Sequence, residues 1–352
     1  MKYPEILRFA DIAGRLGEFD AIIDARSPSE YALDHLPGAI NCPVLNDEER
    51  IQVGTTYKQV NSFEARKMGA AMVARNIGAH IDALWLDKPR EWRPLVYCWR
   101  GGNRSGSLAH IMAKIGWPVV QLDGGYKDFR QFVSSALESP PALDFRVVCG
   151  TTGSGKSRLL QTLESIGAQV LDLEQLAAHR GSVLGGLPSQ PQPTQKAFET
   201  AIRERLHRFD PALPVFVESE SKKVGALRVP GALMEQIRAS RCISLQLSRA
   251  HRVQLLMEDY QHYTRDAGPL NEQLGYLAAL HGNEKISNWQ SLASEGRMPE
   301  LVEALLAEHY DPAYTRSIGR NFPRIADAQV LKLPGIAPGD LLAAARQLHP
   351  QP

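Results

Sequence analysis

The sequence predicts an α/β protein of two domains, the second of which continues into a helical C-terminal region. Three observations predict this class. Short apolar segments alternate with segments of helical periodicity over residues 1–137, which is typical of a sheet with crossover helices. A second alternation begins at residue 145 and becomes mostly helical from about residue 248. Residues 138–144 are polar and contain two prolines, so we expect them to link a domain 1–137 to a domain 145–352.

The strands of the first domain are expected in short apolar runs that end in polar or turn-forming residues. These runs are residues 19–26, 38–44, 93–98 and 118–125. Helical spacing of apolar residues indicates helices over 62–79, 105–116 and 126–137. The second of these helices ends on Gly116, and Pro118 follows two residues later, which is a usual stop signal.

Composition and charge exclude several classes of protein. The chain has 352 residues, a net charge of +1 and 43% hydrophobic residues, so it is not basic throughout and has enough apolar residues for two cores. Its cysteines are far apart, which argues against a disulfide framework and against a metal site; they are Cys42, Cys98, Cys149 and Cys242. No apolar run reaches the length of about 20 residues that spans a bilayer. We therefore expect a reduced, cytoplasmic protein with no membrane partner.

A loop from Cys98 to Arg104 is the first candidate site. The predicted strand ends at Cys98, and the loop before the predicted helix consists of Trp99, Arg100, Gly101, Gly102, Asn103 and Arg104. Glycines let successive backbone N–H groups turn inward around an anion, and a helix N-terminus adds partial positive charge. Arg104, together with Arg100, adds full positive charge. We therefore expect Cys98 to be a catalytic thiolate beneath an oxyanion-binding loop.

Two further segments resemble the rhodanese family. The segment IIDARSPSEYALDHLPGAINCPV, residues 22–44, is similar to the N-terminal signature of rhodanese domains, and LDGGYKDFR, residues 122–130, is similar to their C-terminal signature. The resemblance covers about residues 10–137 and implies a rhodanese-like fold in which Cys98 accepts a sulfur atom as a persulfide. The usual rhodanese loop has its arginine five residues after the cysteine, whereas Arg104 lies six residues after Cys98. This Cys-x5-Arg length is similar to that of phosphatase loops, and it favours a phosphorylated chalcogen as the donor.

The second candidate site is a P-loop, Gly150 to Ser157, which matches G-x-x-x-x-G-K-[ST]. It lies between a predicted strand, 145–150, and a predicted helix, Arg158–Ile166, which is the order that the motif requires in a P-loop NTPase-like domain. The expected phosphate-binding residues are Gly150, Gly153, Ser154, Gly155, Lys156 and Ser157. Backbone N–H groups would surround phosphate oxygens, Lys156 would reach a terminal phosphate, and Ser157 would hold Mg²⁺.

Further strands of this domain are expected at 168–173 and 213–218. Glu218, at the end of the second strand, is the first candidate for a Walker-B-like carboxylate, and Asp172 is the second. The sequence leaves open whether the P-loop holds a nucleotide or the diphosphate of another compound.

Basic residues between 198 and 252 offer candidate contacts to nucleic acid. This stretch contains ten Lys/Arg and six Asp/Glu. Arg203, Arg205 and Arg208 are expected to share a helix face, and Lys222 and Lys223 follow the last predicted strand. Such residues can bind RNA phosphates, although the composition alone fits an ordinary solvated surface as well.

The succession of a rhodanese-like domain and a P-loop domain resembles the tRNA 2-selenouridine synthase family. The resemblance runs to about residue 325 and rests on YCWRGGNRSG (97–106), LNDEERIQVGTTYKQ (45–59), HRGSVLGGL (179–187) and FVESES (216–221). It implies that selenium from selenophosphate replaces the sulfur of wobble 2-thiouridine in tRNA, through an S-geranylated intermediate made from geranyl diphosphate. By the same resemblance Cys98 carries selenium as a selenylsulfide, Gly101, Gly102 and Arg104 hold the oxyanion, and the P-loop holds the diphosphate. No tightly bound cofactor is implied.

Three other functions fit the same residues. A general sulfurtransferase with an NTPase module would load sulfur from thiosulfate and leave tRNA unchanged. A Cys-x5-Arg phosphatase would hydrolyse a phosphoester and would need a general acid near Cys98. A P-loop switch whose rhodanese-like domain only binds a partner would keep its biological effect after Cys98→Ser.

Overall fold

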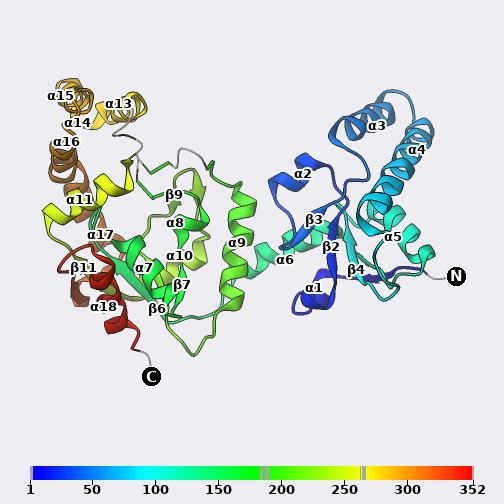
Figure 1. Ribbon diagram of the computed structural model, residues 1–352, viewed down its shortest axis with the longest axis horizontal. Coiled ribbons are helices and arrows are strands. Elements are labelled where there is room, and N and C mark those ends of the chain that lie inside the picture. Colours follow the sequence, from blue (N-terminus) through cyan, green and yellow to red (C-terminus); the bar gives the residue numbers. More distant parts are fainter. Residues whose placement is uncertain (1–2, 183–184, 187–189, 262, 264–266, 351–352) are drawn as a thin grey trace. The chain divides into compact units, whose positions relative to one another are not determined.

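A computed structural model describes residues 3–182, 185–186, 190–261, 263 and 267–350 of the chain (Figure 1). The chain forms two compact units, Met1–Ala136 and Leu137–Pro352, which are described separately below. Of the segment 179–187 noted above, residues 183, 184 and 187 lie outside the described residues. The expected linker begins inside a helix, because α6 (Gly125–Glu138) ends at its first residue. Residues 139–144 then lead into β6 (Phe145–Cys149) without a helix or strand.

The first unit contains a five-stranded parallel sheet in the order β1-β5-β4-β2-β3. Its strands are β1 (Glu5–Leu7), β2 (Ala21–Asp24), β3 (Ala39–Asn41), β4 (Pro94–Tyr97) and β5 (Val120–Leu122). Its other helices are α1 (Phe9–Ile12), η1 (Leu16–Glu18), α2 (Pro28–Leu33), α3 (Asp47–Gln59), α4 (Ser62–His80), η2 (Ile81–Trp85) and α5 (Asn103–Ile115). Parallel strands end at a common edge of the sheet. Since β4 is central, the loop that follows it lies between the segments that follow β2 and β5.

The core of this unit explains why these segments become strands and helices. Ile23 of β2 and Val96 of β4 are fully buried, and they pack with Leu108 and Met112 of α5 in one apolar cluster. Leu108 and Met112 are four residues apart and therefore lie on the same helix face. Burying each such side chain stabilises the fold by roughly 1.5–3 kcal/mol. The packing fixes β4 against α5 and thereby fixes the two ends of the loop between them.

The predicted α/β class of this unit is confirmed, with four of its strands and its three expected helices in place. The prediction missed β1, a three-residue edge strand that is largely exposed. It also missed α3, because DEERIQVGTTYKQ has no apolar stripe and none of its residues is buried. Helix α5 begins at Asn103, two residues earlier than expected. Asn103 and Arg104 therefore belong to the first turn of the helix.

The second unit contains a five-stranded parallel sheet in the order β12-β11-β6-β8-β7. Its strands are β6, β7 (Gln169–Leu171), β8 (Val215–Glu218), β11 (Arg241–Gln246) and β12 (Gln329–Lys332), with a small hairpin of β9 (Lys223–Val224) and β10 (Leu227–Arg228). The helices among them are α7 (Lys156–Ser165), α8 (Leu173–Leu176), α9 (Gln195–Arg208) and α10 (Gly231–Ala239). The central strand β6 leads directly into the P-loop, and α7 follows it, as the motif predicts.

The helical region of this unit begins after β11. It comprises α11 (Arg249–Asp259), α13 (Gly268–Gly275), α14 (Ala278–His281), α15 (Asn283–Ser294), α16 (Met298–Leu305), η3 (Leu306–Tyr310), α17 (Asp311–Asn321), η4 (Pro323–Asp327) and α18 (Pro338–Leu348). The prediction missed β11 and β12, since RCISLQ is half polar and QVLK is a mostly exposed edge strand. Among the described residues, no helix is long and apolar enough to cross a bilayer.

Candidate active sites: a cysteine loop and a P-loop

Cys98 lies at the carboxyl end of β4, buried beneath the loop that leads to α5. The hydroxyl of Ser105, in the first turn of α5, donates a hydrogen bond to Cys98 Sγ at 3.1 Å. Ser105 is fully buried, so water does not compete for this hydrogen bond. A donor at this distance orients the sulfur, which is the nucleophilic atom of a reactive cysteine.

The loop around Cys98 presents main-chain donors. The N–H groups of Arg100 to Arg104 make no hydrogen bond to another group among the described residues, and the last two belong to the N-terminus of α5. Gly101 has φ +65°, and a Cβ there would lie 2.5 Å from the Leu122 carbonyl oxygen. The Gln121 amide donates to the Gly101 carbonyl oxygen at 2.6 Å, which turns that oxygen away from the donors. This arrangement suits an anion.

The turn after β5 packs against the cysteine loop and holds its backbone. The N–H groups of Tyr126 and Lys127 donate to the carbonyl oxygens of Cys98 and Trp99 at 2.8 and 3.0 Å. Gly125 has φ +59°, and a Cβ there would lie 2.2 Å from the Cys98 carbonyl oxygen. Only glycine fits this position. The glycine pair in LDGGYKDFR therefore has a physical role, which is to let one turn pack directly against the loop.

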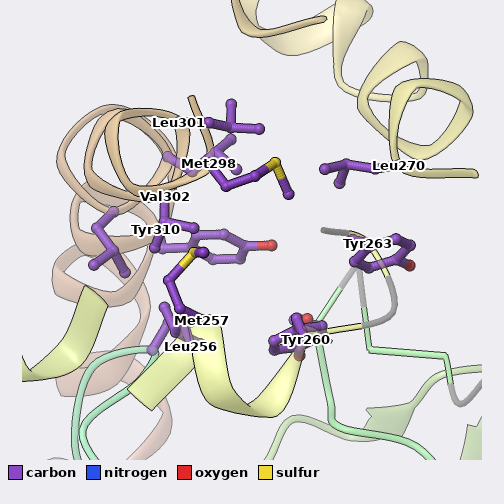
Figure 2. Close-up of a pocket in the computed structure, with 13 residues that line it drawn as sticks. Leu256, Met257, Tyr260, Tyr263, Leu270, Met298, Leu301, Val302 and Tyr310 are labelled. Carbon is purple, nitrogen blue, oxygen red and sulfur yellow. The ribbon is translucent and has the colours of Figure 1, made fainter. Parts of the chain in front are cut away.

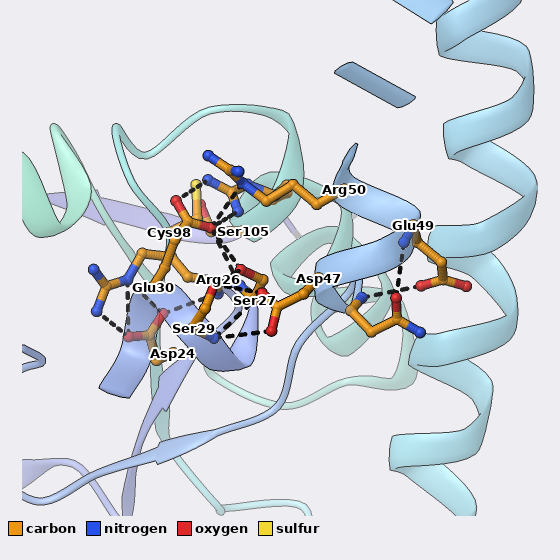
Figure 3. A network of polar contacts seen from close by, with 12 residues as sticks. Asp24, Arg26, Ser27, Ser29, Glu30, Asp47, Glu49, Arg50, Cys98 and Ser105 are labelled. Carbon is orange, nitrogen blue, oxygen red and sulfur yellow. Dashed lines mark hydrogen bonds and ion pairs between the residues drawn. The ribbon is translucent and has the colours of Figure 1, made fainter. Parts of the chain in front are cut away.

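A charged network joins the loop to α2 and α3 (Figure 3). The guanidinium of Arg104 donates to both carboxylate oxygens of Glu30, at 2.6 and 3.3 Å, and Arg50 of α3 lies 3.1 Å from the same carboxylate. Burial favours a higher pKa for Glu30, but the hydrogen bond from Arg104 and the charges of both arginines lower it below its ordinary value. The network thus places two guanidinium groups near the loop, with Glu30 and Asp47 as their acidic neighbours. Arg100, in contrast, is exposed.

A second, fully buried ion pair lies beneath the turn after β5. Arg26 Nη2 is 2.6 Å from Asp24 Oδ2, and both side chains are inaccessible to solvent. The same guanidinium lies over the Tyr126 ring, 4.0 Å from its centroid, while the Tyr126 hydroxyl donates to Asp34 at 2.8 Å. Tyr126 donates its N–H to the loop, so this pair positions the cysteine loop indirectly. Asp24, Arg26 and Asp34 belong to the segment 22–44, and Tyr126 belongs to the segment 122–130; the rhodanese resemblance rests on these two segments.

The P-loop closes around its own lysine. Gly153 and Gly155 have positive φ, +75° and +89°, which sharp turns of this loop require. The ammonium of Lys156 donates to the carbonyl oxygen of Gly150 at 2.8 Å. The expected phosphate-binding residues thus form one loop between β6 and α7, with Ser154 buried inside it.

The expected Walker-B-like residues lie next to this loop, and so does a residue that sequence reasoning missed. Ser157 Oγ donates to Glu174 Oε2 at 2.8 Å, and Glu174 N donates to Glu218 Oε1 at 2.9 Å. Asp172 caps α8 by accepting from Gln175 N at 2.8 Å. Within the part of the chain that the structure describes, Glu218 Oε2 is buried without a hydrogen-bond partner. Glu218 is therefore the carboxylate with a free oxygen at this site.

These carboxyl groups hold protons more strongly than usual. Burial, with the negative charges of Asp172 and Glu174, raises the pKa of Glu218 well above its ordinary value. Burial, followed by the charge of Glu174, raises the pKa of Glu220 to about 8, and burial raises the pKa of Asp172 to about 6. A cation at this position would offset the crowding.

An apolar pocket opens beside the P-loop (Figure 2). It is formed by α11, α16 and η3, and Thr152 of the P-loop contributes to its wall. Its side chains are almost all apolar, and they include Leu256, Met257, Met298, Leu301 and Tyr310. The free volume inside the pocket is about 50 Å³, less than the roughly 300–1,000 Å³ of small-molecule sites, so its side chains would have to move apart around a ligand.

Helix α11 couples this pocket to the phosphate loop. Arg252 is buried and donates to the Thr152 carbonyl oxygen at 2.9 Å, and Asp311 holds its guanidinium at 2.6 and 3.0 Å. A Cβ on Gly153 would lie 2.9 Å from Leu256 Cδ1, so the loop and the apolar wall are in direct contact. A ligand with an anionic head and an apolar tail fits such a pair of surfaces.

The predicted basic face of α9 is wrong. Arg203 is buried and paired with Glu204, and Arg205 is paired with Glu164 at 2.6 Å. Residues two apart on a helix do not face each other, so Arg203 and Arg205 cannot share a surface. The remaining candidates for RNA contacts, Arg208, Lys222 and Lys223, are exposed, and they stay predictions.

Comparison with known proteins identifies the family. A rhodanese-like domain model matches residues 9–132, and a tRNA 2-selenouridine synthase AAA domain model matches residues 143–281. The tRNA 2-selenouridine synthase of Shewanella denitrificans is 34% identical over 352 residues, which cover 91% of this chain and 94% of the relative. The chain belongs to the tRNA 2-selenouridine synthase family.

Two other members of this family show the spread of the similarity. The one from Hydrogenovibrio crunogenus is 32% identical over 321 residues, 83% of this chain and 88% of its own. The one from Nitrosomonas europaea is 39% identical over 244 residues, which span 68% of this chain but only 63% of the relative's own length. The rhodanese-like and P-loop domains expected from the sequence are thus those of this family.

Proposed function

We propose that this chain replaces sulfur by selenium in the wobble 2-thiouridine of tRNA, with Cys98 acting on selenophosphate and the P-loop unit acting on geranyl diphosphate. Membership of a family whose relatives are named tRNA 2-selenouridine synthase supports the overall reaction. The observation that carries the residue assignment is the pairing of a buried cysteine under an anion loop with a phosphate loop that adjoins an apolar pocket.

The cysteine loop is suited to a phosphorylated selenium donor. The N–H groups of Arg100 to Arg104 and the N-terminus of α5 would bind the phosphoryl oxygens, and the Ser105 hydroxyl would stabilise the attacking thiolate. The selenium delivered in this way then attacks C2 of the S-geranylated uridine. A C–Se bond forms, the C–S bond breaks, and geranylthiol carries away the electron pair. Covalent catalysis divides one difficult exchange into two easier steps.

Cys98 can release selenium from its donor by either of two routes. Attack at selenium gives a selenylsulfide and phosphite, and a thiol reductant must later supply two electrons. Attack at phosphorus gives S-phosphocysteine and hydroselenide, and water then releases phosphate without any reductant. Phosphorus-31 NMR of the products distinguishes the two, since phosphite and phosphate have different resonances. Both routes require the Cys98 thiolate.

The P-loop and the apolar pocket fit the two ends of geranyl diphosphate. Lys156 and the loop N–H groups would hold the diphosphate, and the apolar side chains beside Thr152 would move apart to take the ten-carbon chain. The thiouridine sulfur would attack C1 of the geranyl group, so that a C–S bond forms while a C–O bond breaks. Neutralising the departing diphosphate is the kind of stabilisation that P-loop donors provide.

The residues near Ser157 also fit Mg²⁺ bound together with the diphosphate. Mg²⁺ usually takes one or two protein ligands, phosphate oxygens and several waters, so it does not require the dense cluster of ligands that the described residues lack. The free Glu218 Oε2 and the raised pKa of Glu218 are consistent with a cation nearby. Mg²⁺ would supply charge neutralisation of the leaving diphosphate.

Mass spectrometry of nucleosides tests the proposal directly. The purified chain is incubated with thiolated tRNA, geranyl diphosphate and selenophosphate, and the tRNA is then digested. We expect Cys98→Ser to stop at the S-geranylated nucleoside and Lys156→Ala to leave 2-thiouridine largely unchanged. Selenation by Cys98→Ser would remove the catalytic assignment, and geranylation at a normal rate by Lys156→Ala would remove the P-loop role. Sulfur loading from thiosulfate with no change to tRNA would favour the sulfurtransferase, and phosphoester hydrolysis would favour the phosphatase.

A further inference from the structure

The helical hairpin formed by α3 and α4 carries, beyond the first turn of α3, exposed basic residues that the reactions above do not use. The two helices pack side by side (Figure 1). The first turn of α3 is acidic, with Asp47, Glu48 and Glu49, but the remaining residues of the two helices, 50–80, contain five Lys/Arg and one Asp/Glu. All five are exposed; they are Arg50, Lys58, Arg66, Lys67 and Arg75. The single acidic residue, Glu64, pairs with Lys67 at 2.7 Å.

The same hairpin exposes aromatic side chains. Tyr57 is 58% exposed and Phe63 is 70% exposed, and helix α3 buries none of its residues. The ammonium of Lys67 lies 5.7 Å from the centroid of the Phe63 ring. Aromatic rings interleaved with cations are typical of surfaces that stack unpaired bases while binding the phosphates between them.

The exposed face of α4 leads from Phe63 to the cysteine loop. Phe63, Lys67, Ala70 and Ala74 follow one another at helical spacings of four, three and four residues, and therefore lie on one face. Ala70 and Ala74 line an open groove, about 700 Å³ in volume. Gly101, Gly102 and Asn103 of the cysteine loop line the same groove. Small side chains at this position leave room for a flat ring.

Arg50 connects the other helix of the hairpin to the same site. It lies 3.1 Å from Glu30, the carboxylate that holds Arg104 (Figure 3). Both helices of the hairpin thus reach the cysteine loop. An RNA that lies along the hairpin would place an unpaired base within reach of Cys98.

We propose that this hairpin surface, Arg50, Lys58, Phe63, Arg66, Lys67 and Arg75, binds the single-stranded anticodon loop of the tRNA. The proposal rests on the proposed function, because it takes a tRNA base as the acceptor at Cys98. RNA is the occupant that this surface suits, because the basic residues beyond the first turn of α3 alternate with exposed rings and can bind a phosphate backbone.

The test measures RNA binding by the full-length chain. The probe is a fluorescent anticodon stem-loop that carries 2-thiouridine, and its affinity is measured by anisotropy over a range of salt concentrations. We expect Phe63→Ala to weaken binding about tenfold, as loss of one stacked base does. Lys67→Glu should weaken binding and reduce the salt dependence by about one phosphate contact. In turnover, both changes should raise KM for tRNA more than they lower kcat.

Two control variants accompany them. Leu86→Ala removes an apolar side chain that is 74% exposed outside the hairpin. Arg15→Glu reverses a charge next to η1, which precedes β2 and so lies at the opposite edge of the sheet from Cys98. Neither control should change RNA affinity. Thermal denaturation of each variant confirms that it is folded.

The outcomes separate this inference from the proposed function. Unchanged RNA affinity in both hairpin variants overturns the inference, and a changed oligomeric state with unchanged affinity would assign the surface to self-association instead. Failure of the wild-type chain to bind the RNA, or selenation of tRNA by Cys98→Ser, would contradict the proposed function itself. Release of phosphorus product from selenophosphate in the absence of tRNA should be the same in Phe63→Ala as in the wild-type chain.

Discussion

The hydrogen bond from Ser105 to Cys98 offers a sensitive test of the proposed nucleophile. Ser105→Ala removes the only part of the residue that reaches the sulfur, a hydroxyl 3.1 Å from Cys98 Sγ. The loop should keep its shape, because the Gln121 amide still donates to the Gly101 carbonyl oxygen at 2.6 Å. The hydroxyl also lies 3.4 Å from the Gly102 carbonyl oxygen and from the Gln121 amide nitrogen, so the shorter contact to Cys98 Sγ is the main interaction that the change removes.

The expected loss follows from the burial of this pair. Both Ser105 and Cys98 are buried, and a hydrogen bond to a charged group contributes about 1.5–3 kcal/mol. Since about 1.4 kcal/mol corresponds to a tenfold change in rate, the attack on selenophosphate should slow by about 10- to 150-fold. Binding of the donor anion should change little, because the loop N–H groups remain.

A single-turnover assay measures this loss. Enzyme in excess is mixed with selenophosphate without tRNA, and the phosphorus product is followed by rapid quench and phosphorus-31 NMR. Ser107→Ala, two residues further along α5, is the matched control and should react at the wild-type rate. If Ser105→Ala also reacts at the wild-type rate while Cys98→Ser is inactive, then the hydroxyl does not assist the thiolate.

Three further predictions concern the turn, the carboxyl cluster and the pocket. Gly125→Ala should lower thermal stability by more than Gly38→Ala, which also has positive φ (+76°) but no atom within 4 Å of the new Cβ; equal losses would show that the close contact with Cys98 carries no cost. Glu220 has a folded pKa of about 8 against about 4.3 when unfolded, so the folded chain binds more protons between these values and stability falls as the pH rises. The melting temperature of Glu220→Gln should therefore rise relative to that of the wild type as the pH increases from 5 to 9. A difference in melting temperature that does not change with pH would contradict the burial of this carboxyl. Met298→Trp should weaken geranyl diphosphate binding about tenfold or more, since excluding two buried CH₂ groups costs roughly 1.6 kcal/mol. Calorimetry should show unchanged binding of inorganic diphosphate. An equal loss of affinity for both ligands would show that the pocket does not bind the prenyl chain.

The order of strand, glycine loop and helix made both anion loops predictable from the sequence. At Cys98 and at Lys156 the functional residues are neighbours in the chain, and local rules of backbone geometry decide their arrangement. The strands that lead into these loops, β4 and β6, are short apolar runs, because both faces of a central parallel strand are buried. These strands and loops can therefore be predicted without knowledge of the rest of the fold.

The partners of these loops were not predictable, because folding brings them from distant segments. Glu30 lies 74 residues from Arg104, and Arg252 lies 100 residues from Thr152. Glu174 is closer, 17 residues from Ser157, but it stands on a four-residue helix that no periodicity marks. The apolar pocket is equally non-local, since it needs α11, α16 and η3 together.

The error in the predicted basic face of α9 has a simpler cause. Counting charges along 198–252 ignored the direction of each side chain, although Arg203 and Arg205 are two residues apart on a helix and cannot share a face. Helix α3, unlike α4, was not predictable because it lacks an apolar stripe. The absence of buried residues is what leaves its charges and rings exposed.

The central claim is that Cys98 delivers selenium to tRNA. The most direct measurement is the 2-selenouridine content of tRNA hydrolysates from cells that lack this protein and are complemented with either the wild-type chain or Cys98→Ser. The account predicts that the wild-type chain restores 2-selenouridine, whereas Cys98→Ser restores none and leaves S-geranylated nucleoside to accumulate. Restoration of 2-selenouridine by Cys98→Ser would contradict it.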